Sequence, residues 1–145
     1  MDLVTKIKQR KIRSAVIGLG YVGLPLAVEL AEAGAEVVGI DLDRSKVDAI
    51  NARRSYIQDV PTQKVKELVS KGLLSATTAY SALMNVDTIN ICVPTPLRKT
   101  KEPDISYIVK SAEQIARYLK KGQLVILEST TYPGTTDEVL LPMFE

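Results

Sequence analysis

The chain has 145 residues, of which 46% are hydrophobic and 25% charged, and its formal net charge is +2. This length fits one domain with a sizeable core. The small net charge argues against nucleic acid as a partner. The sequence contains one cysteine and no histidine. These counts exclude an internal disulfide and a histidine-based catalytic triad, and they argue against a metal site.

No apolar run approaches the roughly 20 residues that a membrane span needs. The basic stretch at the start, "KIKQRKIR", is not followed by a cleavable apolar segment, so we expect a cytoplasmic protein without membrane contacts. The stretch itself is typical of either a phosphate-binding arm or a solvated helical lead-in, and we favour the lead-in.

The first half of the chain alternates apolar runs with helical patterns. Residues 14–18, "SAVIG", predict a strand, and residues 21–33 predict a helix that Gly34 ends. Residues 36–41, "EVVGID", predict the second strand. The later predicted elements of this half are a helix at 44–51, a loop at 52–61, a helix at 62–72 and a weak strand at 73–78.

The second half continues the alternation with a strong strand predicted at residues 87–93 and an exposed, proline-rich loop at 94–103. Residues 104–122 predict a long helix capped by Asp104, because their apolar positions recur three and four apart. A strand at residues 123–130 and a turn into a further helix complete the pattern. Strands that alternate with helices predict a mainly parallel sheet covered on both faces, hence a doubly wound α/β domain with three αβα layers.

Three glycines stand where the first strand meets the first helix. Gly18, Gly20 and Gly23 match the pattern G-x-G-x-x-G. The first permits a tight turn, the second leaves room for a pyrophosphate, and the third lets helix and strand approach closely. The unpaired N–H groups and the partial positive charge of the helix N-terminus attract phosphate. We favour dinucleotide binding over a turn that merely needs glycine.

Asp41 closes the second strand, 18 residues beyond Gly23 (41 − 23). This spacing is close to the ~20 residues expected for the acid that accepts hydrogen bonds from a ribose. Its carboxylate repels a 2′-phosphate, so NAD is favoured over NADP. Arg44 and Lys46 nearby weaken that preference without reversing it.

Polar or proline-rich segments follow two further strands, at the sheet edge where ligands of such folds collect. Pro94 ends one strand and stiffens a loop that can lie against the cofactor. Thr130 and Thr131 follow the last strand and offer hydroxyls near the expected nicotinamide end, although turn chemistry and helix capping explain them equally well. Cys92 lies inside its strand, and we interpret it as a small buried hydrophobe.

The segments "GLGYVGLPLAVELA", "GID", "ICVPTPL…EPDIS" and "LESTTYPGTT" resemble the UDP-glucose/GDP-mannose dehydrogenase family. The whole chain takes part in the resemblance, which corresponds to the N-terminal, NAD-binding third of such an enzyme with a Rossmann fold. The wording "CVPTPL" and "ESTTYPGTT" is most similar to UDP-N-acetylglucosamine 6-dehydrogenases of bacterial polysaccharide synthesis. The resemblance implies that the whole enzyme oxidises the C6 hydroxyl of a UDP-sugar to a carboxylate in two NAD-dependent steps. It further implies that this sugar is a UDP-N-acetylhexosamine.

The resemblance also implies roles for individual residues. Thr131 matches the threonine that positions a catalytic water, and Thr130 lies near the nicotinamide. The residues implied to bind the cofactor are Gly18, Leu19, Gly20, Tyr21, Val22, Gly23, Asp41, Lys46, Val93, Pro94 and Thr95. The family's catalytic cysteine and sugar-binding region belong beyond Glu145.

We therefore expect residues 1–145 to be a single NAD-binding domain that binds NAD without turnover, cut from an enzyme that forms a homodimer. Two alternatives stay open: a domain of a 6-phosphogluconate or hydroxyacyl-CoA dehydrogenase type, and a non-enzymatic module that senses NAD(H).

Overall fold

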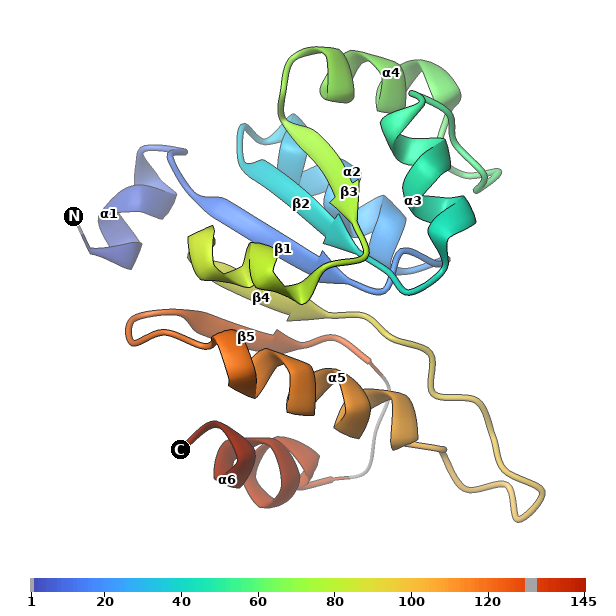
Figure 1. Cartoon of the computed structure of the whole chain (residues 1–145), viewed down its shortest axis with the longest axis vertical. Helices are drawn as coiled ribbons and strands as arrows, with labels where there is room; N and C mark the ends of the chain where they lie inside the picture. Colours follow the sequence, from blue (N-terminus) through green and yellow to red (C-terminus); the bar gives the residue numbers. More distant parts are fainter. Residues whose placement is uncertain (1, 130–132) are drawn as a thin grey trace.

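The computed structural model describes residues 2–129 and 133–145. Within these residues, five parallel strands form one sheet in the order β3-β2-β1-β4-β5 (Figure 1). The strands are β1 (Arg13–Ile17), β2 (Glu36–Ile40), β3 (Leu74–Thr77), β4 (Thr88–Ile91) and β5 (Leu124–Leu127).

Helices cover both faces of the sheet (Figure 1). On one face lie α2 (Gly23–Glu32), α3 (Arg44–Asn51) and α4 (Thr62–Ser70). On the other lie a 3-10 helix, η1 (Tyr80–Asn85), the long α5 (Ser106–Tyr118) and a C-terminal π-helical turn, η2 (Thr136–Leu140), that continues into α6 (Leu141–Phe144). The short α1 (Leu3–Lys8) precedes β1. The predicted doubly wound α/β fold with three layers is confirmed.

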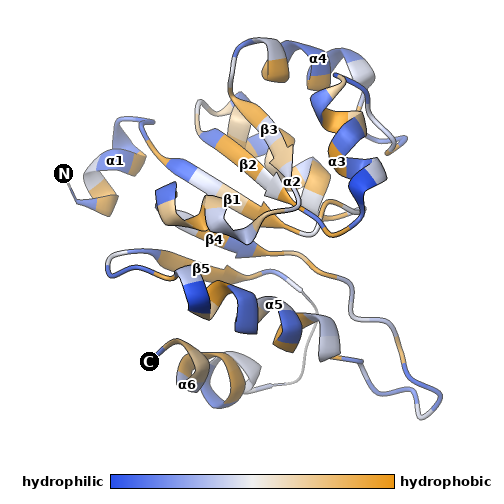
Figure 2. Cartoon of the chain, viewed as in Figure 1, coloured by the Kyte–Doolittle hydropathy of each residue, from blue (hydrophilic) through white to orange (hydrophobic). Residues whose placement is uncertain are grey.

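Two apolar clusters hold the layers together, because side chains of a strand alternate between its faces. Val16 of β1 packs with α2, whereas Ala15 and Ile17 belong to the cluster under α5. Figure 2 shows hydrophobic residues concentrated in the strands and hydrophilic ones at the far tip of the long connection between β4 and α5. Full burial of a side chain such as Ile17 contributes about 1.5–3 kcal/mol, so the sheet is a rigid base for the loops at its edge.

The order of the strands creates a crevice at one edge of the sheet. From β1 the chain moves outward to β2 and β3, and then crosses back to add β4 and β5 on the other side of β1. The connections that leave β1 and β4 therefore run to opposite faces of the sheet. Such a topological switch point opens a ligand-binding crevice beyond the carboxyl ends of the strands.

Several local predictions differ from the structure in their limits. Helix α2 begins at Gly23 rather than at Tyr21, because residues 20–22 form the turn that follows β1. The 3-10 helix η1 was not predicted. Asp104, predicted to cap α5, lies one residue before the N-cap Ile105, although its carboxylate still accepts a hydrogen bond from the Ser106 N–H at 2.9 Å. The basic lead-in is helical, and Lys6 forms an ion pair with Asp87 at 2.7 Å. No described helix is long and apolar enough to cross a membrane.

Candidate functional site

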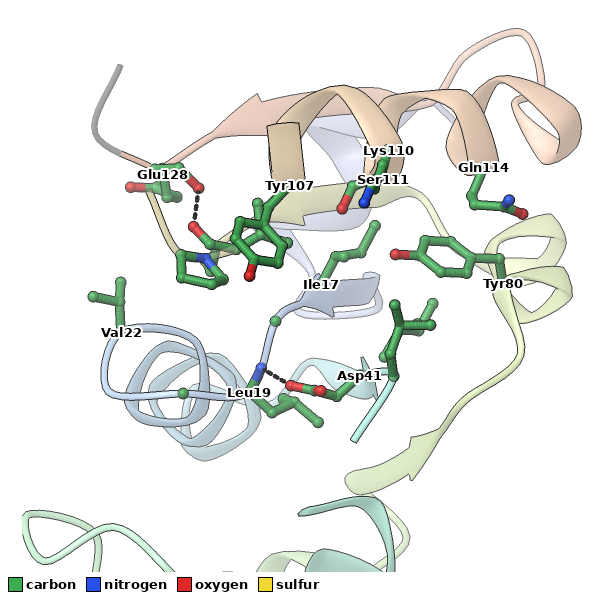
Figure 3. Close-up of a pocket in the computed structure, with 18 of the residues that line it drawn as sticks. Ile17, Leu19, Val22, Asp41, Tyr80, Tyr107, Lys110, Ser111, Gln114 and Glu128 are labelled. Atoms are coloured by element: carbon green, nitrogen blue, oxygen red, sulfur yellow. Dashed lines mark hydrogen bonds between the residues drawn. The ribbon is translucent and has the colours of Figure 1, made fainter. Parts of the chain in front are cut away.

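A cleft of about 980 Å³ lies at the carboxyl edge of the sheet, where the topology places the crevice (Figure 3). One wall consists of the turn after β1 and the end of β2, and the other of the end of β4 and one face of α5. Its volume lies at the upper end of the range for small-molecule and cofactor sites. Most of the residues predicted to bind the cofactor line it: Gly18, Leu19, Gly20, Tyr21, Val22, Asp41, Lys46, Val93, Pro94 and Thr95.

Residues 18–23, here called the glycine corner, contain three glycines that meet different constraints. Gly18 has φ +91°, and a Cβ there would lie 2.7 Å from the Cys92 carbonyl oxygen. A Cβ on Gly23 would lie 1.6 Å from the Gly18 carbonyl oxygen, so this residue permits the close contact between α2 and the turn. A Cβ on Gly20 would meet no protein atom within 4 Å. The fold itself therefore requires Gly18 and Gly23, whereas Gly20 keeps space free in the cleft.

Backbone N–H groups of the glycine corner face outward from α2. The Gly20 carbonyl accepts the Leu24 N–H at 3.1 Å, so it points into the helix. The Tyr21 N–H lies antiparallel to that carbonyl in the same trans peptide and points out of the helix N-terminus. No acceptor among the described residues pairs with the N–H groups of Gly20, Tyr21 or Val22. Such donors, together with the helix dipole, suit a phosphate group.

Asp41 lies directly against the glycine corner (Figure 3). Its Oδ2 accepts the Leu19 N–H at 2.8 Å, and its Oδ1 accepts the Asp43 N–H at 2.8 Å. Each carboxylate oxygen has a second lone pair for another donor. The carboxylate is therefore fixed in position and can still accept hydroxyl groups of a ribose.

Lys46 places a positive charge at the same end of the cleft. It lies in the first turn of α3, and it forms no ion pair with any described residue. Asp43 caps this helix, and its hydrogen bonds from the Ser45 hydroxyl and N–H hold the pKa of the carboxyl group below its usual value. Lys46 can therefore approach an anion without breaking an existing pair.

The end of β4 forms the opposite wall of the cleft. Val93, Pro94 and Thr95 line it, and the Ser129 hydroxyl donates to the Val93 carbonyl at 2.8 Å. This bond ties the connection after β4 to the end of β5. Cys92 is buried as predicted, and burial, with the charge of Glu128, raises the pKa of its thiol to about 11. Cys92 is therefore a protonated, packed side chain.

Of the predicted site residues that the structure describes, Gly23 does not line the cleft. Gly23 lies behind the turn, where it permits the contact with Gly18. Thr130 and Thr131 lie outside the described residues, so their roles stay predictions. Among the described residues, no group of three or more metal-ligating side chains lies together.

Sequence reasoning missed the face of α5 that lines the cleft. Tyr107, Lys110, Ser111 and Gln114 recur three and four apart and share this face (Figure 3). Tyr80 of η1 also lines the cleft, and burial raises the pKa of its hydroxyl. The one signal in the sequence was Ser111, a polar residue that interrupts the apolar positions Ile108, Ala112 and Ile115. All four residues are buried in the structure.

Comparison with known protein families supports one assignment. Residues 12–145 match the family model described as the UDP-glucose/GDP-mannose dehydrogenase family, NAD binding domain. An NDP-N-acetyl-D-galactosaminuronic acid dehydrogenase of Ralstonia nicotianae is 43% identical over 96% of this chain and 32% of its own length. A UDP-N-acetyl-D-glucosamine 6-dehydrogenase of Pseudomonas aeruginosa is 38% identical over 94% of this chain and 31% of its own.

Solved structures agree with these relatives. A GDP-mannose dehydrogenase of Pseudomonas aeruginosa, solved as a ternary complex, superposes with a TM-score of 0.88 at 33% identity. The match covers 92% of this chain and 32% of that one. An arogenate dehydrogenase of Synechocystis covers 92% of this chain and 38% of its own with a TM-score of 0.65, but at 18% identity it shows the fold alone.

Proposed function

Because the chain belongs to the UDP-glucose/GDP-mannose dehydrogenase family, as its NAD-binding domain, we propose that its cleft holds NAD for the oxidation of a UDP-sugar by the whole protein. The chain spans about a third of the length of the curated relatives that it matches. The matches leave the rest of each relative's length uncovered. The activity, substrate and partners of the whole protein are accordingly part of this proposal.

The fit of the residues to NAD supports the proposal. One observation carries it: the Asp41 carboxylate is held by the Leu19 N–H beside unpaired N–H groups and the open space above Gly20. In our proposal the glycine corner holds the pyrophosphate, and Asp41 accepts the ribose hydroxyls while Lys46 contributes positive charge beside them. Val93, Pro94 and Thr95 border the cofactor on the opposite wall.

The substrate class follows from the relatives. Their names include N-acetyl-D-galactosaminuronic acid, N-acetyl-D-glucosamine and N-acetyl-D-mannosamine dehydrogenases. We therefore propose that the whole protein oxidises the C6 hydroxyl of a UDP-N-acetylhexosamine to a carboxylate for polysaccharide synthesis. NAD supplies the hydride acceptor for two successive transfers. Residues 1–145 then form one domain that binds NAD without turnover.

Several expectations attached to this function stay predictions. Thr130 is expected near the nicotinamide and Thr131 beside a catalytic water, and the whole protein is expected to be a cytoplasmic homodimer. The first alternative, a 6-phosphogluconate or hydroxyacyl-CoA type of dehydrogenase, differs from the proposed enzyme in its substrate. The second, a module that senses NAD(H), differs from it because it catalyses no reaction. Both are separated from the proposal by assaying the whole protein.

Calorimetry on the 145-residue chain tests the cofactor site. We expect NAD to bind more tightly than NADP, and Asp41→Asn to weaken NAD by about 10-fold or more, since hydrogen bonds to a charged group are worth about 1.5–3 kcal/mol. Asp48→Asn, an exposed acid on α3, is the matched control and should bind NAD normally. A folded chain without NAD affinity, or an Asp41→Asn variant that binds like the native chain, contradicts this assignment.

An assay of the whole protein tests the substrate class. UDP-N-acetylglucosamine, UDP-N-acetylgalactosamine, UDP-N-acetylmannosamine and UDP-glucose are supplied in turn with NAD, and NADH is followed by its absorbance. We expect two NADH for each N-acetylhexosamine oxidised. Turnover of UDP-glucose alone would contradict the proposed substrate, and turnover of none would favour the alternatives.

A further inference from the structure

Three consecutive peptide groups of the glycine corner are each held by a contact from elsewhere in the chain. The Gly18 N–H donates to the Ile40 carbonyl at 2.8 Å, and the Leu19 N–H donates to Asp41 at 2.8 Å. The third contact is a hydrogen bond from the Tyr56 hydroxyl to the Leu19 carbonyl. The first two come from the end of β2, whereas Tyr56 lies in the connection between α3 and α4.

The Tyr56 contact determines the direction of an N–H group. The Leu19 carbonyl and the Gly20 N–H belong to one trans peptide and point in opposite directions. A donor on the carbonyl therefore fixes the Gly20 N–H on the side away from Tyr56. Gly20 lines the cleft and Tyr56 does not, so the aromatic ring acts from behind the turn. A hydrogen bond to the carbonyl also polarises the peptide and makes its N–H a stronger donor.

Tyr56 is itself held rigidly. The Ser55 hydroxyl donates to the Ile57 carbonyl at 3.0 Å, which closes a small turn around Tyr56. Ile57 and Val60 anchor the same connection in the core cluster under α2. Burial, followed by the negative charges of Asp41 and Asp43, raises the pKa of the Tyr56 hydroxyl. The group therefore stays protonated and remains a donor near neutral pH.

We propose that Tyr56 is a positioning residue that holds the Leu19–Gly20 peptide in its phosphate-binding orientation before the dinucleotide arrives. The proposal rests on the proposed NAD site and extends it to a residue outside the cleft. A site that is already ordered loses less entropy when its ligand binds, so affinity rises without a new contact to that ligand. The effect should be confined to ligands that carry the pyrophosphate.

The test compares three ligands on the 145-residue chain: NAD, ADP-ribose and adenosine. Tyr56→Phe removes only the hydroxyl, and we expect it to raise the Kd for NAD and ADP-ribose about 3- to 10-fold, the effect of one hydrogen bond. The affinity for adenosine, measured by NMR titration, should stay within about twofold because adenosine has no phosphate. Gln58→Ala is the matched control, since it removes an exposed side chain from the same connection.

The outcomes separate this proposal from the cofactor site itself. A native chain that binds no NAD refutes the site, whereas a native chain that binds NAD and a Tyr56→Phe variant that binds it equally well refutes only the role of Tyr56. An equal loss for adenosine, or the same loss in Gln58→Ala, shows a general effect on the domain and also overturns the proposal. Para-aminophenylalanine at position 56 restores a donor and should restore ADP-ribose affinity. If Tyr56→Phe does not fold, the para-aminophenylalanine variant is the test. Weak binding of ADP-ribose by this variant would refute the positioning role of Tyr56.

Discussion

The two ends of the sheet differ in whether their polar groups have partners within the described residues. At the carboxyl end, the N–H groups of Gly20, Tyr21 and Val22 pair with no acceptor among the described residues. At the amino end, Lys6 and Asp87 are joined at 2.7 Å. There the Gln123 side-chain amide also donates to the carbonyls of Leu83 in η1 and of Val86, which follows η1, at 2.7 and 2.8 Å.

This difference agrees with the proposed NAD site at the carboxyl end. A donor without a protein partner is costly unless water or a ligand satisfies it, whereas a paired group contributes to the stability of the fold. Substitutions at the carboxyl end should therefore change the affinity for NAD. Those at the amino end should change the free energy of unfolding. Variants at each end can test this division between effects on affinity and effects on stability.

Gly23→Ala should be an exception to this division, because Gly23 lies at the carboxyl end and yet its substitution should lower the stability of the fold. Its Cβ would overlap the Gly18 carbonyl oxygen at 1.6 Å, and because this contact is with backbone atoms, the backbone itself would have to shift. We expect a loss of about 3 kcal/mol or more in the free energy of unfolding, the upper range for overpacking. Urea denaturation followed by circular dichroism measures this loss, and an unchanged midpoint would contradict the packing seen here.

Gly20→Ala is the matched counterpart of that variant and should follow the division. The added methyl group meets no protein atom within 4 Å, so the free energy of unfolding should stay nearly unchanged. The same methyl group occupies the space that a pyrophosphate needs. NAD affinity should fall by about 10-fold or more, or ~1.4 kcal/mol. Calorimetry with NAD and denaturation with urea, done on one preparation, would expose any parallel loss of stability.

The sequence predicted the part of the site that depends on local backbone chemistry. The pattern G-x-G-x-x-G and an acid at the end of the next strand identify a turn and its partner, and Asp41 indeed contacts Leu19. The alternation of strands and helices predicted a parallel sheet covered on both faces, whereas the strand order comes from the structure. The predicted features are short-range or topological, so they can be read without tertiary contacts.

The missed residues depend on tertiary packing. Tyr107 and Lys110 lie on a polar stripe of α5, which the sequence cannot distinguish from a solvent-exposed face. Tyr56 lies in a segment that the sequence predicts only as a loop, and its bond to Leu19 joins residues 37 positions apart. The start of α2 was also misplaced, because the helical pattern begins at Tyr21, whereas residues 20–22 form a turn and the helix begins at Gly23.

Asp87→Asn tests the amino end and should have the smallest effect. Burial acts to raise the pKa of Asp87, but the hydrogen bond from Lys6, the Arg13 N–H and the charges of both residues outweigh it, so the pKa lies below its ordinary value of 3.8. A carboxyl group whose pKa is lowered in the folded state stabilises the protein at pH values above 3.8, and this contribution disappears as the pH falls through the folded pKa. We therefore expect Asp87→Asn to cost about 1 kcal/mol at about pH 7 and less at about pH 3.

The control for this prediction is Glu36→Gln, which removes an exposed ion pair with Arg13 at the same end of the sheet. That pair is separated by 3.4 Å with both side chains more than half exposed, so its loss should hardly change the free energy of unfolding. NAD affinity should be native in both variants, because the amino ends of the strands lie across the sheet from the glycine corner. A cost for Asp87→Asn that is equal at both pH values would show that shape rather than charge matters there. A loss of NAD affinity would mean that the two ends of the sheet are coupled.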